Sequence, residues 1–343
     1  MRIIIDAMGG DNAPGEIVKG AVMAKKEFDA DITLVGQREK IEECLAAEGG
    51  ADMDIVDARE IISMEDDPST AVRRKKDSSM AVALNLLRDG QGDAVVSAGS
   101  TGALLTGATL TVKRIRGIRR AALAPILPTG DYGAMLIDCG ANVECTAEYL
   151  LQFAFMGSFY AKKVMGCANP RVGLLNIGTE DTKGDELRHE AFALLKKAGD
   201  EGRINFVGNV EGTGVYDNQA EVVVTDGFTG NVLLKTTEGV AKFMLGQIKD
   251  VFSKRVINKL AAAIVMKDLR QMKKTLDINQ VGGTALLGIS KPVLKAHGSS
   301  RAAAICAAVG QAIGFAQSGI VDEIASNVGS MKINDIGESG AQD

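Results

Sequence analysis

Six short turns, rich in glycine and polar residues, carry most of the groups in this sequence that could do chemistry. Each turn follows an apolar run, and together they supply backbone N–H groups, hydroxyls, amides and carboxylates. A single turn of this kind would indicate only tight geometry, but a row of them predicts a site with many donors for an anion. The turns are Asp6 to Asn12, Ser97 to Gly102, Asp138 to Asn142, Asn176 to Gly184, Gly208 to Gly212 and Thr225 to Asn231.

The apolar runs before these turns have the character of buried parallel strands. They contain four to six β-branched or aliphatic residues without polar alternation, as expected for strands covered on both faces. Helical patterns lie between most of them, so we expect one three-layer α/β/α architecture with a mostly parallel sheet, and the six turns along one edge. The predicted strands are Arg2 to Asp6, Ile32 to Gly36, Asp54 to Val56, Ala94 to Ser97, Met135 to Asp138, Arg171 to Asn176, Ile204 to Gly208 and Glu221 to Asp226.

The chain changes character after about residue 230. Long helices are predicted over roughly Asn231 to Lys274, with a break, and over Ser300 to Ser318. We expect a single domain over residues 1–330, with a projecting helical hairpin at about 240–280 and a flexible tail at 331–343, although the length would also permit two domains.

Composition excludes several classes of protein. The 343 residues carry a formal net charge of -5, which makes nucleic acid a poor partner. The five cysteines form no C-x-x-C pair, which argues against a disulfide framework and a zinc site and favours a reducing cytoplasm. The N-terminus is too poor in apolar residues for a signal peptide, and no stretch is long enough to span a bilayer. We therefore expect a cytoplasmic protein.

The motifs of several common enzyme classes are missing. The sequence contains no G-x-G-x-x-G after a strand, no G-x-x-x-x-G-K-[ST] and no G-x-S-x-G. Only two histidines, His189 and His297, are available to a nucleophile and base pair. Cys139 follows a strand and could attack a thioester, but a small buried cysteine is more often inert. Covalent acyl-enzyme chemistry is therefore disfavoured.

At six places the sequence resembles the acyl-ACP:phosphate acyltransferase family, the PlsX type. The resemblance follows the chain in order from end to end. It implies reversible transfer of a long acyl group from acyl carrier protein to inorganic phosphate, with no metal or organic cofactor. It also implies a homodimer with a fold like that of isocitrate dehydrogenase and phosphotransacetylase. The motifs are DAMGGDNAP (Asp6 to Pro14), AVRRKKDSSM (Ala71 to Met80), SAGSTGALL (Ser97 to Leu105), LLNIGTEDTKGDE (Leu174 to Glu186), VTDGFTGNVLLK (Val224 to Lys235) and KAHGSS (Lys295 to Ser300).

Phosphate is already an anionic nucleophile at neutral pH, so such an enzyme must mainly hold it against the thioester and stabilise the oxyanion. The resemblance marks Lys183 and Asn231 as functional. We assign Lys183 as the charge partner of phosphate or the oxyanion and Asn231 as an amide donor. The plain alternatives are a solvated loop lysine and a helix cap.

Five further residues are candidates for substrate binding. Ser100, Thr101 and Gly102 open a helix and could form a phosphate nest, or could simply cap that helix. His297 could hydrogen-bond phosphate or the leaving thiolate. Asp226 is placed with this group, although aspartates in such turns, Asp6 and Asp11 included, usually bind turn N–H groups and here lack companions for a metal.

Two charged segments predict partners. Arg73, Arg74, Lys75 and Lys76 form a basic run that could dock an acidic acyl carrier protein, or could be a solvated helix face. Residues 253–275 carry seven basic residues and one acidic residue around an apolar centre with Leu260, Ile264 and Val265. That pattern predicts peripheral contact with the inner face of the cell membrane, where a glycerol-3-phosphate acyltransferase would use the product, or packing against a dimer partner.

Other functions stay open. The same architecture could transfer a small acyl group from coenzyme A to phosphate, as a phosphotransacetylase does. An oxidoreductase of the same broad fold is disfavoured because no metal-carboxylate cluster or nucleotide motif is evident. A membrane scaffold would explain the basic apolar segment but not the six turns.

Overall fold

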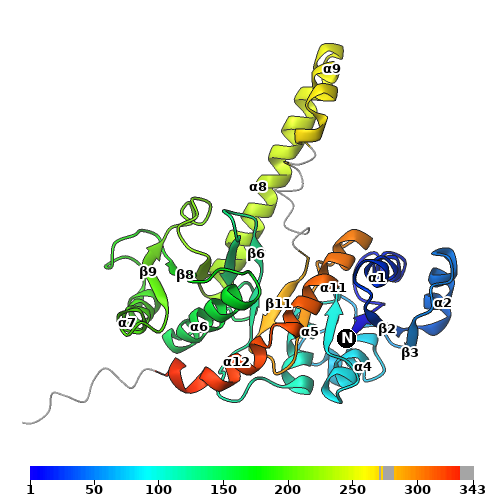
Figure 1. The fold of residues 1–343 in the computed structure, drawn as a ribbon, viewed down its shortest axis with the longest axis horizontal. Coiled ribbons are helices and arrows are strands. Elements are labelled where there is room, and N and C mark those ends of the chain that lie inside the picture. Colours follow the sequence, from blue (N-terminus) through cyan, green and yellow to red (C-terminus); the bar gives the residue numbers. More distant parts are fainter. Residues whose placement is uncertain (270–271, 273–281, 333–343) are drawn as a thin grey trace, which may run out of the picture.

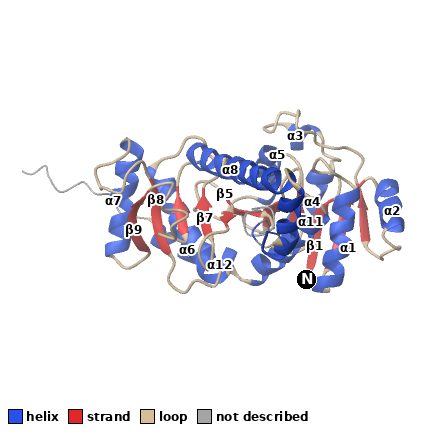
Figure 2. Ribbon diagram, turned by 90° about the horizontal axis from the view of Figure 1, so that it is seen from above, coloured by secondary structure: helices blue, strands red, loops and turns tan. Residues whose placement is uncertain are grey.

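The protein, studied as a computed structural model, is described here for residues 1–269, 272 and 282–332. Its strands form two sheets that follow one another across the molecule, with helices on both sides (Figure 2). Neighbouring strands run parallel except around three short ones. The predicted α/β class and mostly parallel pairing are therefore confirmed, but the prediction of a single sheet is wrong.

The seven-stranded sheet contains the N-terminal strands and two strands from near the C-terminus. β11 is antiparallel to both its neighbours, and all other pairs are parallel. In sheet order its strands are β3 (Asp54–Asp57), β2 (Asp31–Gly36), β1 (Arg2–Asp6), β4 (Ala94–Ser97), β12 (Val293–Lys295), β11 (Thr284–Leu287) and β5 (Ala122–Ala124).

The five-stranded sheet is built from the middle of the chain. Only β6 is antiparallel to its neighbour. In sheet order the strands are β6 (Ile126–Leu127), β7 (Ala134–Ile137), β10 (Val222–Val224), β8 (Arg171–Leu175) and β9 (Asn205–Val210). Pro125 separates β5 from β6, and since proline has no N–H to give to a strand ladder, the chain leaves one sheet and enters the other at this residue.

Apolar side chains on the two faces of β1 show how the layers form. Ile3 and Ile5 belong to one buried cluster with residues of α1 and α11, whereas Ile4 belongs to a second cluster with residues of α4 and α5. Both clusters continue across both sheets. The helices are α1 (Gly15–Phe28), α2 (Arg38–Ala47), α3 (Ala71–Arg74), α4 (Ser79–Arg88), α5 (Thr101–Gly107) with its π-helical continuation (Ala108–Val112), α6 (Ala147–Lys163), α7 (Glu186–Asp200), α8 (Gly227–Ser253), α9 (Val256–Ile264), α11 (Ala302–Gln317) and α12 (Ile320–Asn327).

All eight predicted strands are present, with ends that differ by at most two residues. The division into two sheets changes the placing of the six turns, because two follow strands of the seven-stranded sheet and four belong to the five-stranded sheet. They therefore do not share one edge. The short strands β5, β6, β11 and β12 were not predicted, because their sequences, A-L-A, I-L, T-A-L-L and V-L-K, contain few β-branched residues.

The predicted helical projection is present. α8 leaves the body of the molecule and α9 folds back beside its far end (Figure 1). The helix breaks where Arg255 takes an extended conformation. The expected continuation to residues 274–280 lies outside the described residues, as does the expected tail from residue 333 onward. A short helix at Val328–Met331 ends where that tail was expected to begin. The assignment of residues 1–330 to one domain stays a prediction.

Among the described residues, no single helix has both the length and the apolar composition needed to cross a membrane. One bent pair, Ala302–Gln317 with Ile320–Met331, meets those two criteria only when taken together.

Candidate functional site

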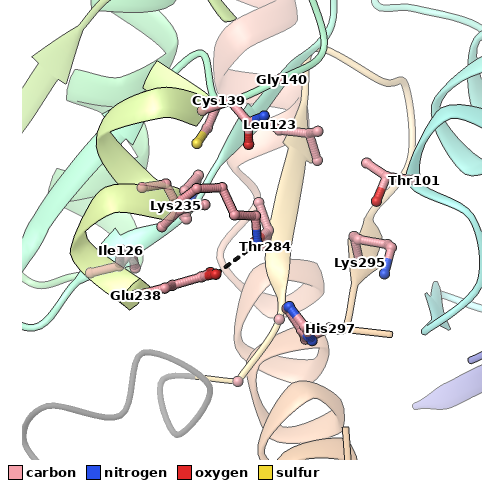
Figure 3. Close-up of a pocket in the computed structure, with 15 residues that line it drawn as sticks. Thr101, Leu123, Ile126, Cys139, Gly140, Lys235, Glu238, Thr284, Lys295 and His297 are labelled. Atoms are coloured by element: carbon pink, nitrogen blue, oxygen red, sulfur yellow. Dashed lines mark hydrogen bonds and ion pairs between the residues drawn. The ribbon is translucent and has the colours of Figure 1, made fainter. Parts of the chain in front are cut away.

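A pocket of about 290 Å³ opens where the strand ends of the two sheets meet α8 (Figure 3). This volume is at the lower end of the range for small-molecule sites. Its walls come from the turns after β4 and β7, the β5–β6 segment, the first turns of α8 and the ends of β11 and β12. It is lined by Thr101, Leu123, Pro125, Ile126, Cys139, Gly140, Asn231, Leu234, Lys235, Glu238, Gly282, Gly283, Thr284, Lys295 and His297.

Glycines set the position of α8. A Cβ atom at Gly230 would lie 2.0 Å from the carbonyl oxygen of Asp138, and one at Gly227 would lie 2.6 Å from the carbonyl oxygen of Asn142. The helix start therefore packs directly on the loop after β7. This packing brings Asn231 to the pocket, facing Gly140. Lys235 and Glu238 follow on the same helix face, as spacings of four and seven residues require.

Asp226 fixes the start of α8, the helix that carries Asn231. It caps α8 by accepting a hydrogen bond from the backbone N–H of Thr229 at 2.9 Å, and its carboxylate also pairs with Arg188. Burial raises the pKa of this carboxyl, but the Thr229 hydrogen bonds and the Arg188 charge outweigh burial, so its pKa lies below the ordinary value. Asp226 therefore binds turn N–H groups, as expected for its type. It does not line the pocket, and Asn231 is not the helix cap.

The loop after β7 is held by another buried carboxylate. Asp138 accepts hydrogen bonds from the backbone N–H groups of Leu123 at 2.9 Å, Cys139 at 2.6 Å and Asn142 at 2.6 Å. Burial raises the pKa of the Cys139 thiol to about 12. A thiol held protonated in this way is a poor nucleophile. The structure thus agrees with the expectation that Cys139 is inert.

β12 supplies the basic side of the pocket. Lys295 is 8% exposed, and His297 follows it two residues later. The backbone N–H of Ser299 donates to Nδ1 of His297 at 3.2 Å, so the neutral ring carries its proton on Nε2. Burial lowers the pKa of His297, and the positive charge of Lys235 lowers it further.

The predicted Ser100 to Gly102 turn contributes one residue to the pocket lining. Ser100 is buried and caps α5, accepting from the backbone N–H of Ala103 at 3.5 Å. Thr101 lines the pocket, while Gly102 packs against Pro68. The turn therefore brings a hydroxyl to the site and uses the other side chains for packing.

Lys183 lies in the β8–α7 loop and does not line this pocket. Its side chain is 46% exposed, and Nζ lies 4.0 Å from a carboxylate oxygen of Glu180. The backbone carbonyl of Lys183 accepts a hydrogen bond from the amide of Asn176 at 2.9 Å. A second depression of about 360 Å³ lies beside this loop and is lined by Asn176, Gly184, Asp185, Arg188 and Thr229, among others. His189 lies at the surface, as expected.

The predicted partner surfaces lie on different elements. Of the basic run, Arg73, Arg74 and Lys76 are exposed, whereas Lys75 is bound to Asp66 at 2.6 Å and to the carbonyl of Ile61 at 2.9 Å. On α9, Leu260 is 62% and Ile264 84% exposed, and Val265 is partly buried. The basic residues Arg270, Lys273 and Lys274 of this segment lie outside the described residues.

Sequence reasoning missed four polar residues of the pocket: Lys235, Glu238, Thr284 and Lys295. The first two could have been found from Asn231, since residues four and seven positions later share its helix face. Lys295 ends the apolar run Val293 to Lys295, where a charged residue is unexpected. Thr284 carried no signal, because β11 was not predicted.

Comparison with known proteins gives consistent similarities. Residues 1–323 match the family model described as "Fatty acid synthesis protein". The chain is 47% identical over 326 residues to a phosphate acyltransferase of Desulfitobacterium hafniense, covering 94% of this chain and 96% of that protein. It is 46% identical to a phosphate acyltransferase of Thermoanaerobacter pseudethanolicus, covering 96% of this chain and 98% of that protein.

The fold has a counterpart among solved structures. A phosphotransacetylase from Streptococcus pyogenes superposes with a TM-score of 0.63 at 19% identity, covering 92% of this chain and 94% of that chain. The similarity confirms the expected phosphotransacetylase-like fold.

Proposed function

This chain belongs to the fatty acid synthesis protein family, and from that premise we propose that it is a phosphate acyltransferase that moves a long-chain acyl group from acyl carrier protein to inorganic phosphate. The product is an acyl phosphate for phosphatidic acid and phospholipid synthesis, and the transfer is reversible. The observation that carries this proposal is a pocket that combines two lysines, an imidazole, an amide and a hydroxyl on a chain so similar to phosphate acyltransferases.

The chemistry needs little beyond positioning. A phosphate oxygen attacks the thioester carbonyl carbon, and the carbonyl oxygen becomes an oxyanion. When this intermediate collapses, the C–S bond breaks and the thiolate leaves with the carrier. Charged donors stabilise both anions in a site that excludes water. His297, with its Nε2–H in the pocket, is the candidate to hydrogen-bond phosphate or the leaving thiolate.

Asn231 and Lys183 keep the roles that the sequence suggests. Asn231 stands at the pocket wall and serves as an amide donor to the oxyanion. Lys183 is the charge partner of phosphate or the oxyanion, which requires its exposed side chain to turn from Glu180 toward the acyl group. Thr101 adds a hydroxyl donor. Ser100 and Asp226 cap α5 and α8, and Gly102 packs against Pro68, so these three position the pocket lining.

The partners follow from the surfaces. Arg73, Arg74 and Lys76 offer a basic face to the acidic carrier protein, and the enzyme works as a homodimer. Leu260, Ile264 and Val265 on the projecting hairpin contact the inner face of the cell membrane from the cytoplasm. There the acyl phosphate passes to a membrane-bound glycerol-3-phosphate acyltransferase.

The decisive experiment compares two acyl donors. We expect purified enzyme to form acyl phosphate from palmitoyl-ACP and labelled phosphate, and to do so poorly from palmitoyl-CoA. Preference for palmitoyl-CoA or for acetyl-CoA would instead identify a phosphotransacetylase-like enzyme, the alternative that the fold similarity permits. Absence of acyl phosphate with every donor would contradict both.

A further inference from the structure

The geometry points to Lys295 as the residue that binds inorganic phosphate, within a polar row that crosses four neighbouring strands, β1, β4, β12 and β11. This inference rests on the proposed function and adds to it the location of the phosphate subsite. It adds a residue to which neither the sequence patterns nor the family resemblance assigned a role.

The row is set by strand register. Asp6 on β1 lies opposite Ser97 on β4, and Ser97 lies opposite Lys295 on β12. The hydroxyl of Ser97 donates to the Asp6 carboxylate at 2.6 Å. Thr284 on β11 continues the row on the far side of Lys295. Asp6, Ser97 and Lys295 are buried. Three buried polar side chains at one level of a sheet are costly, so the row indicates a site rather than a core layer.

Lys295 is the member of the row whose positive charge has no carboxylate partner at ion-pair distance among the described residues, so it is available to bind an anionic ligand. Its ammonium group has three donors. It donates to two backbone carbonyl oxygens, that of Ala98 at 3.3 Å and that of Ala296, and it forms no ion pair with a carboxylate of the described residues. A buried charge is stable only when it is paired. An anion in the pocket would supply the missing partner.

The other pocket donors surround the same space. In the view of Figure 3, Thr101 lies on the side of Lys295, His297 lies below, and Lys235 faces them from α8. Lys235 is already paired with Glu238 at 2.7 Å, so its charge is largely compensated. Tetrahedral phosphate can accept hydrogen bonds from an ammonium, a hydroxyl and an imidazole at once, which is the set gathered beside Lys295.

The protonation of Lys295 makes the inference testable by pH. Burial lowers its pKa to about 8, and the carboxylates of Asp6 and Asp11 oppose this effect while Lys235 adds to it. Among the described residues, His297, Glu238 and Cys139 are further titratable groups that line the same pocket. Phosphate needs the protonated ammonium, so phosphate affinity falls as pH rises through about 8. The wild-type KM for phosphate should therefore rise across this range.

The first test replaces the charge and keeps the volume. Lys295→Met should raise the KM for phosphate at least about tenfold, leave the KM for acyl-ACP nearly unchanged, and abolish the rise in phosphate KM above pH 8. Lys291→Met is the matched control. Lys291 lies near the other end of β12 and also donates to a carbonyl, that of Leu87 at 2.7 Å, away from the pocket. Its variant should keep wild-type values.

The second test uses the wild-type enzyme and needs no variant to fold. Trace acetylation at pH 8, read residue by residue by mass spectrometry, should be slowed at Lys295 by inorganic phosphate and unchanged at Lys291. Equal labelling with and without phosphate would overturn the inference, as would an unchanged phosphate KM in Lys295→Met. Absence of acyl phosphate formation by the wild type would refute the proposed function instead, and phosphate protection of Lys295 would still be measurable.

Discussion

Asn231 and Asp226 lie five residues apart, but Asn231 lines the pocket whereas Asp226 stabilises the start of α8. Asp226 is buried, caps α8 and pairs with Arg188, whereas Asn231 is exposed to the pocket. Their substitution should therefore separate chemistry from folding, which is the clearest test at the scale of single residues.

We expect Asn231→Ala to lower the rate of acyl phosphate formation by about a hundredfold, the usual cost of losing one oxyanion donor. Its thermal unfolding should be nearly unchanged, because the helix cap is intact. Lys183→Ala should lower the rate by a similar factor if it provides charge to the oxyanion. Single-turnover assays with purified variants measure both, and full activity in either variant would remove that assignment.

Asp226→Ala provides the contrast. Loss of the cap should cost about 0.5–2 kcal/mol of stability, and loss of the Asp226 pair leaves the mostly buried Arg188 with the exposed carboxylate of Asp185 as its ion-pair partner. Its activity should recover under conditions where the protein is fully folded. A variant with normal unfolding and no activity would instead mean that Asp226 touches substrate.

Residue types at strand ends were predictable from the sequence, and the pocket residues on strands were not. Asn231, Thr101 and His297 belong to glycine-containing sequence motifs that are recognisable from their composition, and in the structure Thr101 and Asn231 lie in the first turns of α5 and α8. The proposed role of Lys295 depends on its register with Ser97 and Asp6, which are about 200 and 290 positions away in the sequence. Register between distant strands is a tertiary property that local pattern does not contain.

At the scale of elements, the long parallel strands were predictable because each is a continuous apolar run. The short antiparallel strands were not predictable. Because β5 and β6 mark the point where the chain passes from one sheet to the other, the division into two sheets was not predicted either. The hairpin of α8 and α9 was predictable because the sequence after about residue 230 changes to long helical patterns, with basic residues around an apolar segment. Four exposed apolar side chains, those of Val256, Ile257, Leu260 and Ile264, belong to α9, the helix at the tip of the projection (Figure 1).

We expect Leu260→Glu with Ile264→Glu to abolish flotation with liposomes that contain anionic lipid. Burying two such side chains contributes about 3 kcal/mol or more, so partitioning should weaken at least about a hundredfold. Val207→Glu, at an exposed apolar position on β9, is the control and should float like wild type. Equal flotation of all three proteins would favour a dimer contact for α9.

At the scale of the whole molecule, the net charge of -5 opposes an acidic partner. A carrier protein must therefore be drawn by a local patch, and the exposed members of the basic run on and after α3 are candidates. Because Lys75 is held by Asp66, it contributes less to steering than its neighbours do.

Reversal of three charges tests this steering. The variant Arg73→Glu, Arg74→Glu, Lys76→Glu should raise the KM for acyl-ACP roughly tenfold at low salt, flatten its salt dependence and leave the KM for phosphate unchanged. Lys26→Glu, Lys40→Glu, Lys196→Glu makes the same change in net charge at exposed positions elsewhere. Equal effects of the two triple variants would mean that only net charge matters.

The place of β12 in the seven-stranded sheet has a consequence for biosynthesis. β12 lies between β4 and β11, in the interior of a sheet whose other parallel strands come from the first 97 residues. While the ribosome is making the intervening segment, β4 has an unpaired edge that can pair with other chains. The nascent protein must keep that edge open for almost 200 residues, and the proposed phosphate subsite is incomplete until Lys295 has been made.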